Sequence, residues 1–154
     1  MNRWLYGACL LGVLAGGAMH ASSAVAQESA DVAGVTSRTD AFFRNLESQA
    51  RTTEEVFTAF LAEGRLRDRK EDIKKLVDSY GKLNSQYGAT RNVEKISARA
   101  VGKDVLVLTY LAKTDSYPIA WYITFYRPPG SMEKKNGWVV IALRFDTKIE
   151  EVGK

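Results

Sequence analysis

The sequence predicts an α+β domain in which about three N-terminal helices pack on a curved, four-stranded antiparallel sheet. Two observations lead to this prediction. Between residues 40 and 88 the apolar residues recur every three or four positions, as they do on one side of a helix, whereas after Gly88 they recur every second position, as in strands. Helical patterns followed by strand patterns are typical of domains whose helices lie against one antiparallel sheet.

The first two helices have recognisable starts. The first helical pattern covers residues 40–49, and Asp40 or the preceding Thr39 can cap its free backbone amides. Thr52 and Glu55 then have the spacing of a capping box, in which each side chain bonds the backbone amide of the other residue. Gly64 can end this second helix in the left-handed region.

The third helix and the four strands follow in order. The third helix is expected over residues 68–86, with an apolar stripe formed by Ile73, Leu76, Val77, Tyr80, Leu83 and Tyr87. Gly88 is its natural end. The period-two segments predict four strands, Val93–Val101, Val105–Lys113, Ile119–Arg127 and Trp138–Asp146.

Alternation along these strands predicts two different faces of the sheet. The odd-numbered residues form a nearly continuous apolar surface that should pack on the helices: Val105, Val107, Thr109, Leu111, Ile119, Trp121, Ile123, Phe125, Val139, Ile141, Leu143 and Phe145. The even-numbered residues form a mixed face: Leu106, Leu108, Tyr110, Ala120, Tyr122, Thr124, Tyr126, Trp138, Val140, Ala142, Arg144 and Asp146. A β-bulge would make the faces alternate less cleanly.

The even-numbered face is too apolar for ordinary solvent exposure and too polar for a dry core, so a partner or ligand is expected on it. Tyrosine suits such a surface because it buries area and keeps a polar group. One interpretation is a homodimer interface, or a contact with another envelope protein. The other is a shallow site for a small apolar or anionic ligand. The candidate residues are Tyr110, Tyr122, Thr124, Tyr126 and Arg144.

The N-terminus has the features of a secretory signal peptide. A short basic segment, residues 1–3, precedes an uncharged apolar run over residues 4–19 and a group of small residues that ends at Ala26. Cleavage is predicted after Ala26, which makes residues 1–26 the signal peptide. An uncleaved membrane anchor is the alternative, although the run is short for a span of about 20 residues.

Cleavage would leave a flexible leader over residues 27–38 and a single α+β domain over residues 39–150. The expected location is the periplasm or the cell exterior, with no stable membrane span. Cleavage would also remove the only cysteine and the only histidine of the chain. A cysteine nucleophile, a histidine base and a Cys/His zinc site are then excluded, and we predict no catalytic residues, no metal site and no cofactor. The mild, interspersed charge argues against nucleic-acid binding.

The order of elements resembles that of the nuclear transport factor two-like superfamily, which shares its cone of helices and sheet with cystatin-like folds. The residues that carry this resemblance to small exported bacterial proteins of that superfamily, for which no activity is assigned, are Tyr87-Gly88, Tyr110-Leu111, Trp121–Tyr126, Gly137-Trp138 and Arg144-Phe145-Asp146. The resemblance covers residues 40–150. It implies a domain type that includes isomerases, dehydratases, small-molecule binders and assembly modules, so it leaves the function open.

Enzymes of that superfamily commonly place an aspartate or histidine base in an apolar cone. Among the acidic residues, four aspartates fall on expected helix ends, an exposed helix face or turns: Asp40, Asp78, Asp115 and Asp146. The expected function is therefore an exported, non-catalytic binding or assembly module, homodimeric through the sheet face. A small-molecule binder that uses the cone or the tyrosine-rich face is the alternative. An isomerase- or hydrolase-like enzyme with a carboxylate base is the less favoured third interpretation.

Overall fold

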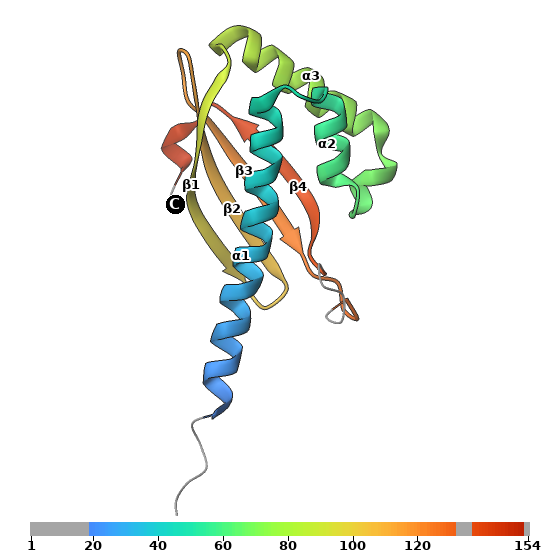
Figure 1. The fold of residues 1–154 in the computed structure, drawn as a ribbon, viewed down its shortest axis with the longest axis vertical. Coiled ribbons are helices and arrows are strands. Elements are labelled where there is room, and N and C mark those ends of the chain that lie inside the picture. Colours follow the sequence, from blue (N-terminus) through green and yellow to red (C-terminus); the bar gives the residue numbers. More distant parts are fainter. Residues whose placement is uncertain (1–18, 132–136, 153–154) are drawn as a thin grey trace, which may run out of the picture.

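The computed structural model describes residues 19–131 and 137–152 and confirms the predicted fold class. Three helices lie against a four-stranded antiparallel sheet (Figure 1). The helices are α1 (Met19–Ser48), α2 (Thr53–Leu61) and α3 (Lys70–Tyr87), and the strands are β1 (Thr90–Val101), β2 (Val105–Thr114), β3 (Ile119–Tyr126) and β4 (Val139–Asp146). Two short 3₁₀ helices, η1 (Arg65–Asp68) and η2 (Ile149–Glu151), complete the described elements.

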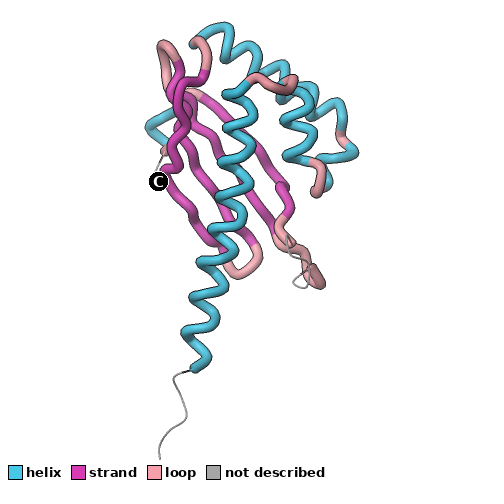
Figure 2. Tube along the Cα trace, in the orientation of Figure 1, coloured by secondary structure: helices cyan, strands magenta, loops and turns pink. Residues whose placement is uncertain are grey.

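The strands follow one another across the sheet in the order β1-β2-β3-β4, and every neighbouring pair is antiparallel (Figure 2). Consecutive strands can therefore be joined by short connections, which keeps the sheet a simple meander. All three helices precede the sheet in the chain. They gather on one of its faces, where α1 crosses the strands (Figure 1).

Helix α1 is much longer than the sequence analysis predicts. It starts at Met19, so residues 27–38 are helical where a flexible leader was expected, and Thr39 and Asp40 lie within the helix and do not cap it. The buried side chain of Val35 and the half-buried Val32 continue the apolar stripe of α1 toward its N-terminus. Packing of this stripe stabilises the helix over the segment around Val32 and Val35, where a flexible leader was expected.

Arg38 fixes this part of α1 to the rest of the fold. Its guanidinium donates hydrogen bonds to the carbonyl oxygens of Phe60 (2.8 Å) and Trp138 (2.9 Å) and to Oε2 of Glu63 (2.9 Å). Burial lowers the pKa of Arg38, and the neighbouring Glu63 partly offsets this effect. One side chain thus ties α1 to α2 and to the start of β4.

The predicted signal peptide lies largely outside the described residues. Of residues 1–26, the structure describes only residues 19–26, which form the start of α1. The predicted cleavage point at Ala26 therefore falls inside a helix of the full chain. None of the helices described here is long and apolar enough to cross a membrane.

The predicted capping box of α2 is confirmed. The hydroxyl of Thr52 accepts from the amide of Glu55 (3.2 Å), and Oε2 of Glu55 accepts from the amide of Thr52 (2.8 Å). These bonds lower the pKa of Glu55. The helix ends at Leu61, and its C-cap, Ala62, is in the right-handed region, so Gly64 does not end the helix by a left-handed turn.

Gly64 instead allows a close approach between α2 and the sheet. A β-carbon at this position would lie 2.5 Å from the carbonyl oxygen of Val140. At the other end of the helical layer, Gly88 follows α3 with a φ of 88°, which fits its predicted role as the helix end. Its position beside the carboxylate of Asp115 leaves no room for a side chain.

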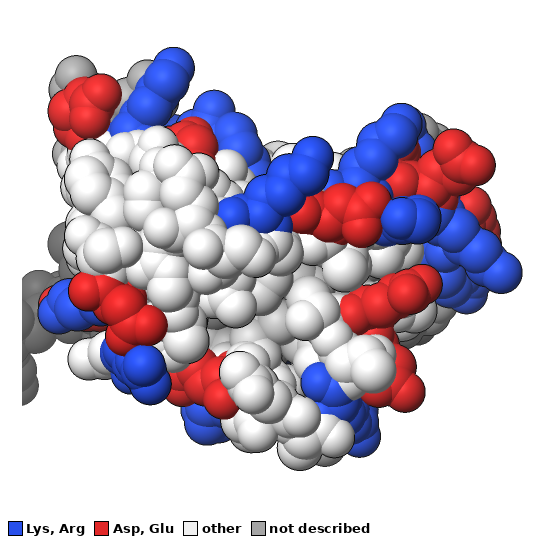
Figure 3. Space-filling view, turned by 90° about the horizontal axis from the view of Figure 1, so that it is seen from above, with Lys and Arg blue, Asp and Glu red and all other residues white. Residues whose placement is uncertain are grey.

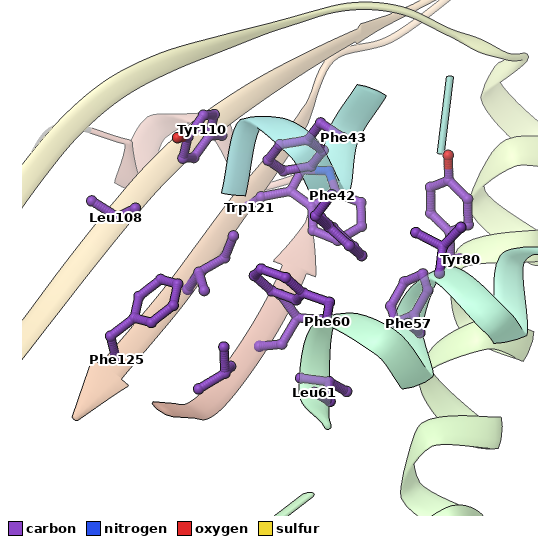
Figure 4. Close-up of a cluster of buried hydrophobic side chains, with 14 of the residues drawn as sticks. Phe42, Phe43, Phe57, Phe60, Leu61, Tyr80, Leu108, Tyr110, Trp121 and Phe125 are labelled. Atoms are coloured by element: carbon purple, nitrogen blue, oxygen red, sulfur yellow. The ribbon is translucent and has the colours of Figure 1, made fainter. Parts of the chain in front are cut away.

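The interior between helices and sheet is filled by aromatic rings (Figure 4). Trp121 of β3 is at its centre, with the ring of Phe43 perpendicular at 5.2 Å between centroids and the ring of Phe145 at 4.6 Å. Phe42, Phe57 and Tyr80 surround the same indole from the three helices. Such rings bury large apolar areas and gain further from edge-to-face contacts. Together these side chains form one packed cluster between the helices and the sheet.

Candidate functional site

The register of β2 and β3 decides which residues can form a common surface. Tyr110 pairs with Trp121, Leu108 with Ile123 and Leu106 with Phe125. Residues that pair directly point to the same side of a sheet. Even-numbered residues of β2 therefore share a face with odd-numbered residues of β3, because an even number of residues, Asp115 to Pro118, separates the two strands.

The predicted faces are consequently wrong for β2. Leu106, Leu108 and Tyr110 were assigned to the mixed face, yet they face the helices and are 0–2% exposed. The odd-numbered residues of β2 were assigned to the core but point away from the helices: Val105, Val107, Thr109 and Leu111. We call the side of the sheet that faces away from the helices the outer face.

In β4 the prediction is partly confirmed. Leu143 and Phe145 pair with Ile123 and Trp121 and belong to the core, as expected. A register shift opposite Thr124 and Phe125 then brings Val140 into the core and leaves Ile141 44% exposed. This irregularity is the bulge that the sequence analysis allowed for, and it reverses the assignment of these two residues.

Four of the five candidate residues come together on the outer face. Tyr122 pairs with Arg144 across β3 and β4, and the Arg144 guanidinium lies 4.4 Å from the centre of the Tyr122 ring. Thr124 and Tyr126 follow on the same side of β3. Nε of Arg144 is also 3.8 Å from Oδ2 of Asp146, so its charge is shared between a ring and a carboxylate. The Arg144 side chain is nevertheless 61% exposed, so much of its guanidinium remains open to solvent.

Tyr110 is the candidate residue that the structure separates from the others. Its ring is buried against Phe43 on the helix side of the sheet. Its hydroxyl donates a hydrogen bond of 2.8 Å to Oδ1 of Asp40 in α1. Burial raises the pKa of Tyr110, and the adjacent Asp40 raises it further, so this hydroxyl stays protonated.

The outer face is ordered in rows that cross the strands. One row contains Val101, Val105 and Tyr126, and the next contains Arg99, Val107, Thr124 and Ala142. A third row contains Ser97, Thr109, Tyr122 and Arg144, and a fourth contains Glu94, Leu111, Ala120 and Asp146. The face thus runs from an apolar end to an end that carries charges of both signs.

The apolar end of the outer face is accessible to solvent. Val101 is 45% exposed, and α1, α2 and α3 all lie on the other side of the sheet (Figure 1). Toward the charged end, Thr109 and Ala120 are buried although they point outward. In Figure 1 the short η2 lies at the β1 edge of the sheet, on the opposite side from β4, so the chain after β4 crosses the sheet near these residues. The open surface is therefore centred on the first two rows.

The acidic residues show no arrangement for metal binding. Within the described ranges, no three His, Cys, Asp or Glu side chains are grouped so that they could hold a metal ion. Asp78 pairs with Lys74 on an exposed helix face (2.9 Å), and Asp115 lies in the turn after β2, as the sequence analysis expects. Asp40 differs from its expected role, since it bonds Tyr110 from the C-terminal third of α1.

Positive and negative side chains are mixed on the face of the molecule that Figure 3 shows. On the end of the molecule seen in Figure 3, lysine and arginine side chains alternate with aspartate and glutamate around an uncharged area. No extended region of one sign forms on that face.

No protein-family model matches the chain, and neither a curated protein nor a solved structure is significantly similar to it.

Proposed function

We propose that this protein is an exported, non-catalytic assembly module that pairs with a second copy of itself through the outer face of its sheet. The observation that carries the proposal is the exposed apolar end of this face, with Val101 45% and Ile141 44% exposed and Val105, Val107 and Tyr126 half-buried beside them. A contiguous exposed apolar surface on an otherwise charged protein commonly marks a contact site.

The composition of the outer face suits an identical partner. A two-fold contact brings the same surface together twice, so the surface must complement itself. The rows that flank the apolar end contain the cations Arg99 and Arg144 and the anions Glu94 and Asp146. A copy related by a two-fold axis can place cations against anions while the valines and Ile141 meet at the centre.

The interior supports the non-catalytic part of the proposal. Enzymes of small cone-shaped domains need an internal space with a titratable group, whereas here Trp121 and its neighbours fill the interior. Asp40, whose carboxylate reaches the buried Tyr110, accepts the hydrogen bond of this protonated tyrosine. The resemblance to the nuclear transport factor two-like superfamily is compatible with this role, because assembly modules occur among its members.

The mass of the protein in solution tests the proposal. Native mass spectrometry and sedimentation of the wild-type protein should show a dimer at micromolar concentration. Ile141→Lys should give a monomer, because the dimer would bury an unpaired charge. Tyr117→Lys is the matched control, since Tyr117 is equally exposed (42%) but lies between β2 and β3, off the outer face. A monomeric wild type, or a dimer that survives Ile141→Lys, would refute the proposal.

A further inference from the structure

A groove between α1 and β1 is distinct from both the outer face and the filled interior. It has a volume of about 350 Å³ and is lined by Asp40, Phe43, Arg44 and Glu47 of α1 and by Arg91, Asn92, Val93 and Lys95 of β1, with Tyr110 of β2 between them. This volume is at the lower end of the range for small-ligand sites, about 300–1,000 Å³. The groove therefore has room for a molecule of amino-acid size.

The two walls of the groove differ in charge. Asp40 and Glu47 are seven residues apart in α1, which places them two turns apart on the same side of the helix, with Arg44 between them. On the opposite wall, Arg91 and Lys95 of β1 supply two cations. Anions of a helix thus face cations of a strand across the space.

These charges do not neutralise one another across the groove. Arg91 is directed to Asp115, at 2.6 Å, and not to α1. Lys95 pairs in register with Tyr110, beside the Tyr110–Asp40 hydrogen bond, yet no ion pair joins Lys95 to Asp40 or to Glu47 in the described part of the chain. Lys95 on the strand and Asp40 and Glu47 on the helix therefore keep hydrogen-bonding capacity for a molecule that lies between the two walls.

The position of Asp40 is fixed by the protein. Tyr110 donates to Oδ1, so the carboxylate is held in place in the groove and Oδ2 remains available as an acceptor. Phe43 and Val93 add apolar surface between the charged groups. A ligand that matches these features has an ammonium group at one point, a carboxylate at another, and an apolar part between the walls.

We infer that the groove between α1 and β1 binds a small zwitterionic molecule of amino-acid type, with its ammonium group at Asp40 and Glu47 and its carboxylate at Lys95. The inference goes beyond the proposed assembly role and is independent of it. The Tyr110 hydroxyl acts as a positioning group, because it orients Asp40 and does not itself reach the ammonium.

Three related probes test which charges the groove recognises. L-phenylalanine carries both groups, phenethylamine lacks the carboxylate, and 3-phenylpropionate lacks the ammonium. Each is titrated into the ¹⁵N-labelled full chain and followed by NMR. L-phenylalanine should shift the backbone amides of residues 40–47 and 91–95, and each single-charge analogue should bind roughly tenfold more weakly, because one charged hydrogen-bond set is lost.

Two matched variants locate the site. Lys95→Gln should weaken L-phenylalanine binding several-fold, whereas Lys75→Gln should leave it unchanged, because Lys75 lies on the exposed side of α3 and pairs with Asp72 (3.9 Å). Equal binding of 3-phenylpropionate would show that the groove reads an anion alone and would overturn the inference. So would unchanged spectra at millimolar L-phenylalanine, or an equal loss of affinity in both lysine variants. None of these results depends on whether the protein is a dimer.

Discussion

The Tyr110 hydroxyl lies 2.8 Å from Oδ1 of Asp40 and joins β2 to the C-terminal third of α1. The two residues are 70 positions apart in the chain. Sequence patterns alone assigned Tyr110 to a mixed sheet face that should meet a partner or ligand, and Asp40 to a helix cap. Their contact shows that α1 passes over β2 at this point, and both residues line the groove between α1 and β1.

Removal of this hydrogen bond should destabilise the protein moderately. Tyr110→Phe keeps the ring against Phe43 but deletes the donor, so we expect the free energy of unfolding to fall by about 1–2 kcal/mol. Chemical denaturation measures the change. Tyr117→Phe is the control, because Tyr117 is exposed and should tolerate the loss of its hydroxyl. An equal effect of both substitutions would show that the bond to Asp40 contributes nothing.

The same tyrosine should make stability depend on alkaline pH. Burial raises the pKa of Tyr110 in the folded protein, whereas in the unfolded chain a tyrosine titrates near its ordinary value of about 10. Above that pH the unfolded state loses a proton that the folded state keeps, so the stabilisation is present below about pH 10 and is lost as the pH rises. The difference between wild type and Tyr110→Phe isolates this contribution. If the free energies of unfolding of the two proteins fell in parallel above pH 10, Tyr110 would not be the cause of the pH dependence.

Asp115 provides a second titration test. Its Oδ1 accepts from Nε of Arg91 (2.6 Å) and its Oδ2 from the amide of Ala89 (3.1 Å). The Arg91 guanidinium holds the pKa of Asp115 below its ordinary value. Stability from this contact is therefore present above the unfolded pKa of about 3.9 and is lost as the pH falls through the folded value. NMR titration of Arg91→Gln should find the pKa of Asp115 raised, and an unchanged pKa would show that Arg91 is not its cause.

Gly64 should be intolerant of even the smallest side chain. In Gly64→Ala the new β-carbon would collide with the carbonyl oxygen of Val140, a backbone atom that cannot rotate away. We expect a loss of about 1–3 kcal/mol in the free energy of unfolding, as for other overpacked sites. Gly81→Ala in α3 is the matched control. Nothing lies within 4 Å of its β-carbon position, so this change should stabilise the helix by up to about 1 kcal/mol.

The sequence predicts the kinds and order of the elements well, because hydrophobic period reports directly on local geometry. It fails where the answer depends on how elements meet. The spacing of Val32, Val35 and Phe42 fits the continuation of α1, but the small polar residues between them hide this signal. The part of the helix around Arg38 is held by bonds to Phe60 and Trp138, which are distant in the chain.

The sequence predicts the candidate surface only in part, because it does not show how neighbouring strands meet. Alternation fixes which residues of one strand share a face, but the turn decides how the faces of two strands correspond. An even number of residues between β2 and β3 reverses the numbering, so Tyr110 joins Trp121 while Tyr122 joins Thr109. In β4 the bulge changes the correspondence between residue number and sheet face again, so that Val140 faces the core and Ile141 does not. The groove is formed by residues of α1, β1 and β2, and no local sequence pattern indicates that these residues lie together.

A pair of neighbouring substitutions in β2 tests this reversed assignment directly. Leu108 is fully buried and faces the helices, whereas Val107 is half-buried on the outer face. Leu108→Asn should cost roughly 3–5 kcal/mol, since it removes core packing and buries an unsatisfied amide. Val107→Asn should cost about 1 kcal/mol, within the range of strand propensities. Both should be measured in the Ile141→Lys background, where dimer formation cannot contribute to stability. If Val107→Asn proved the more damaging change, the faces of β2 would be as alternation alone predicts, and the outer face described here would not exist.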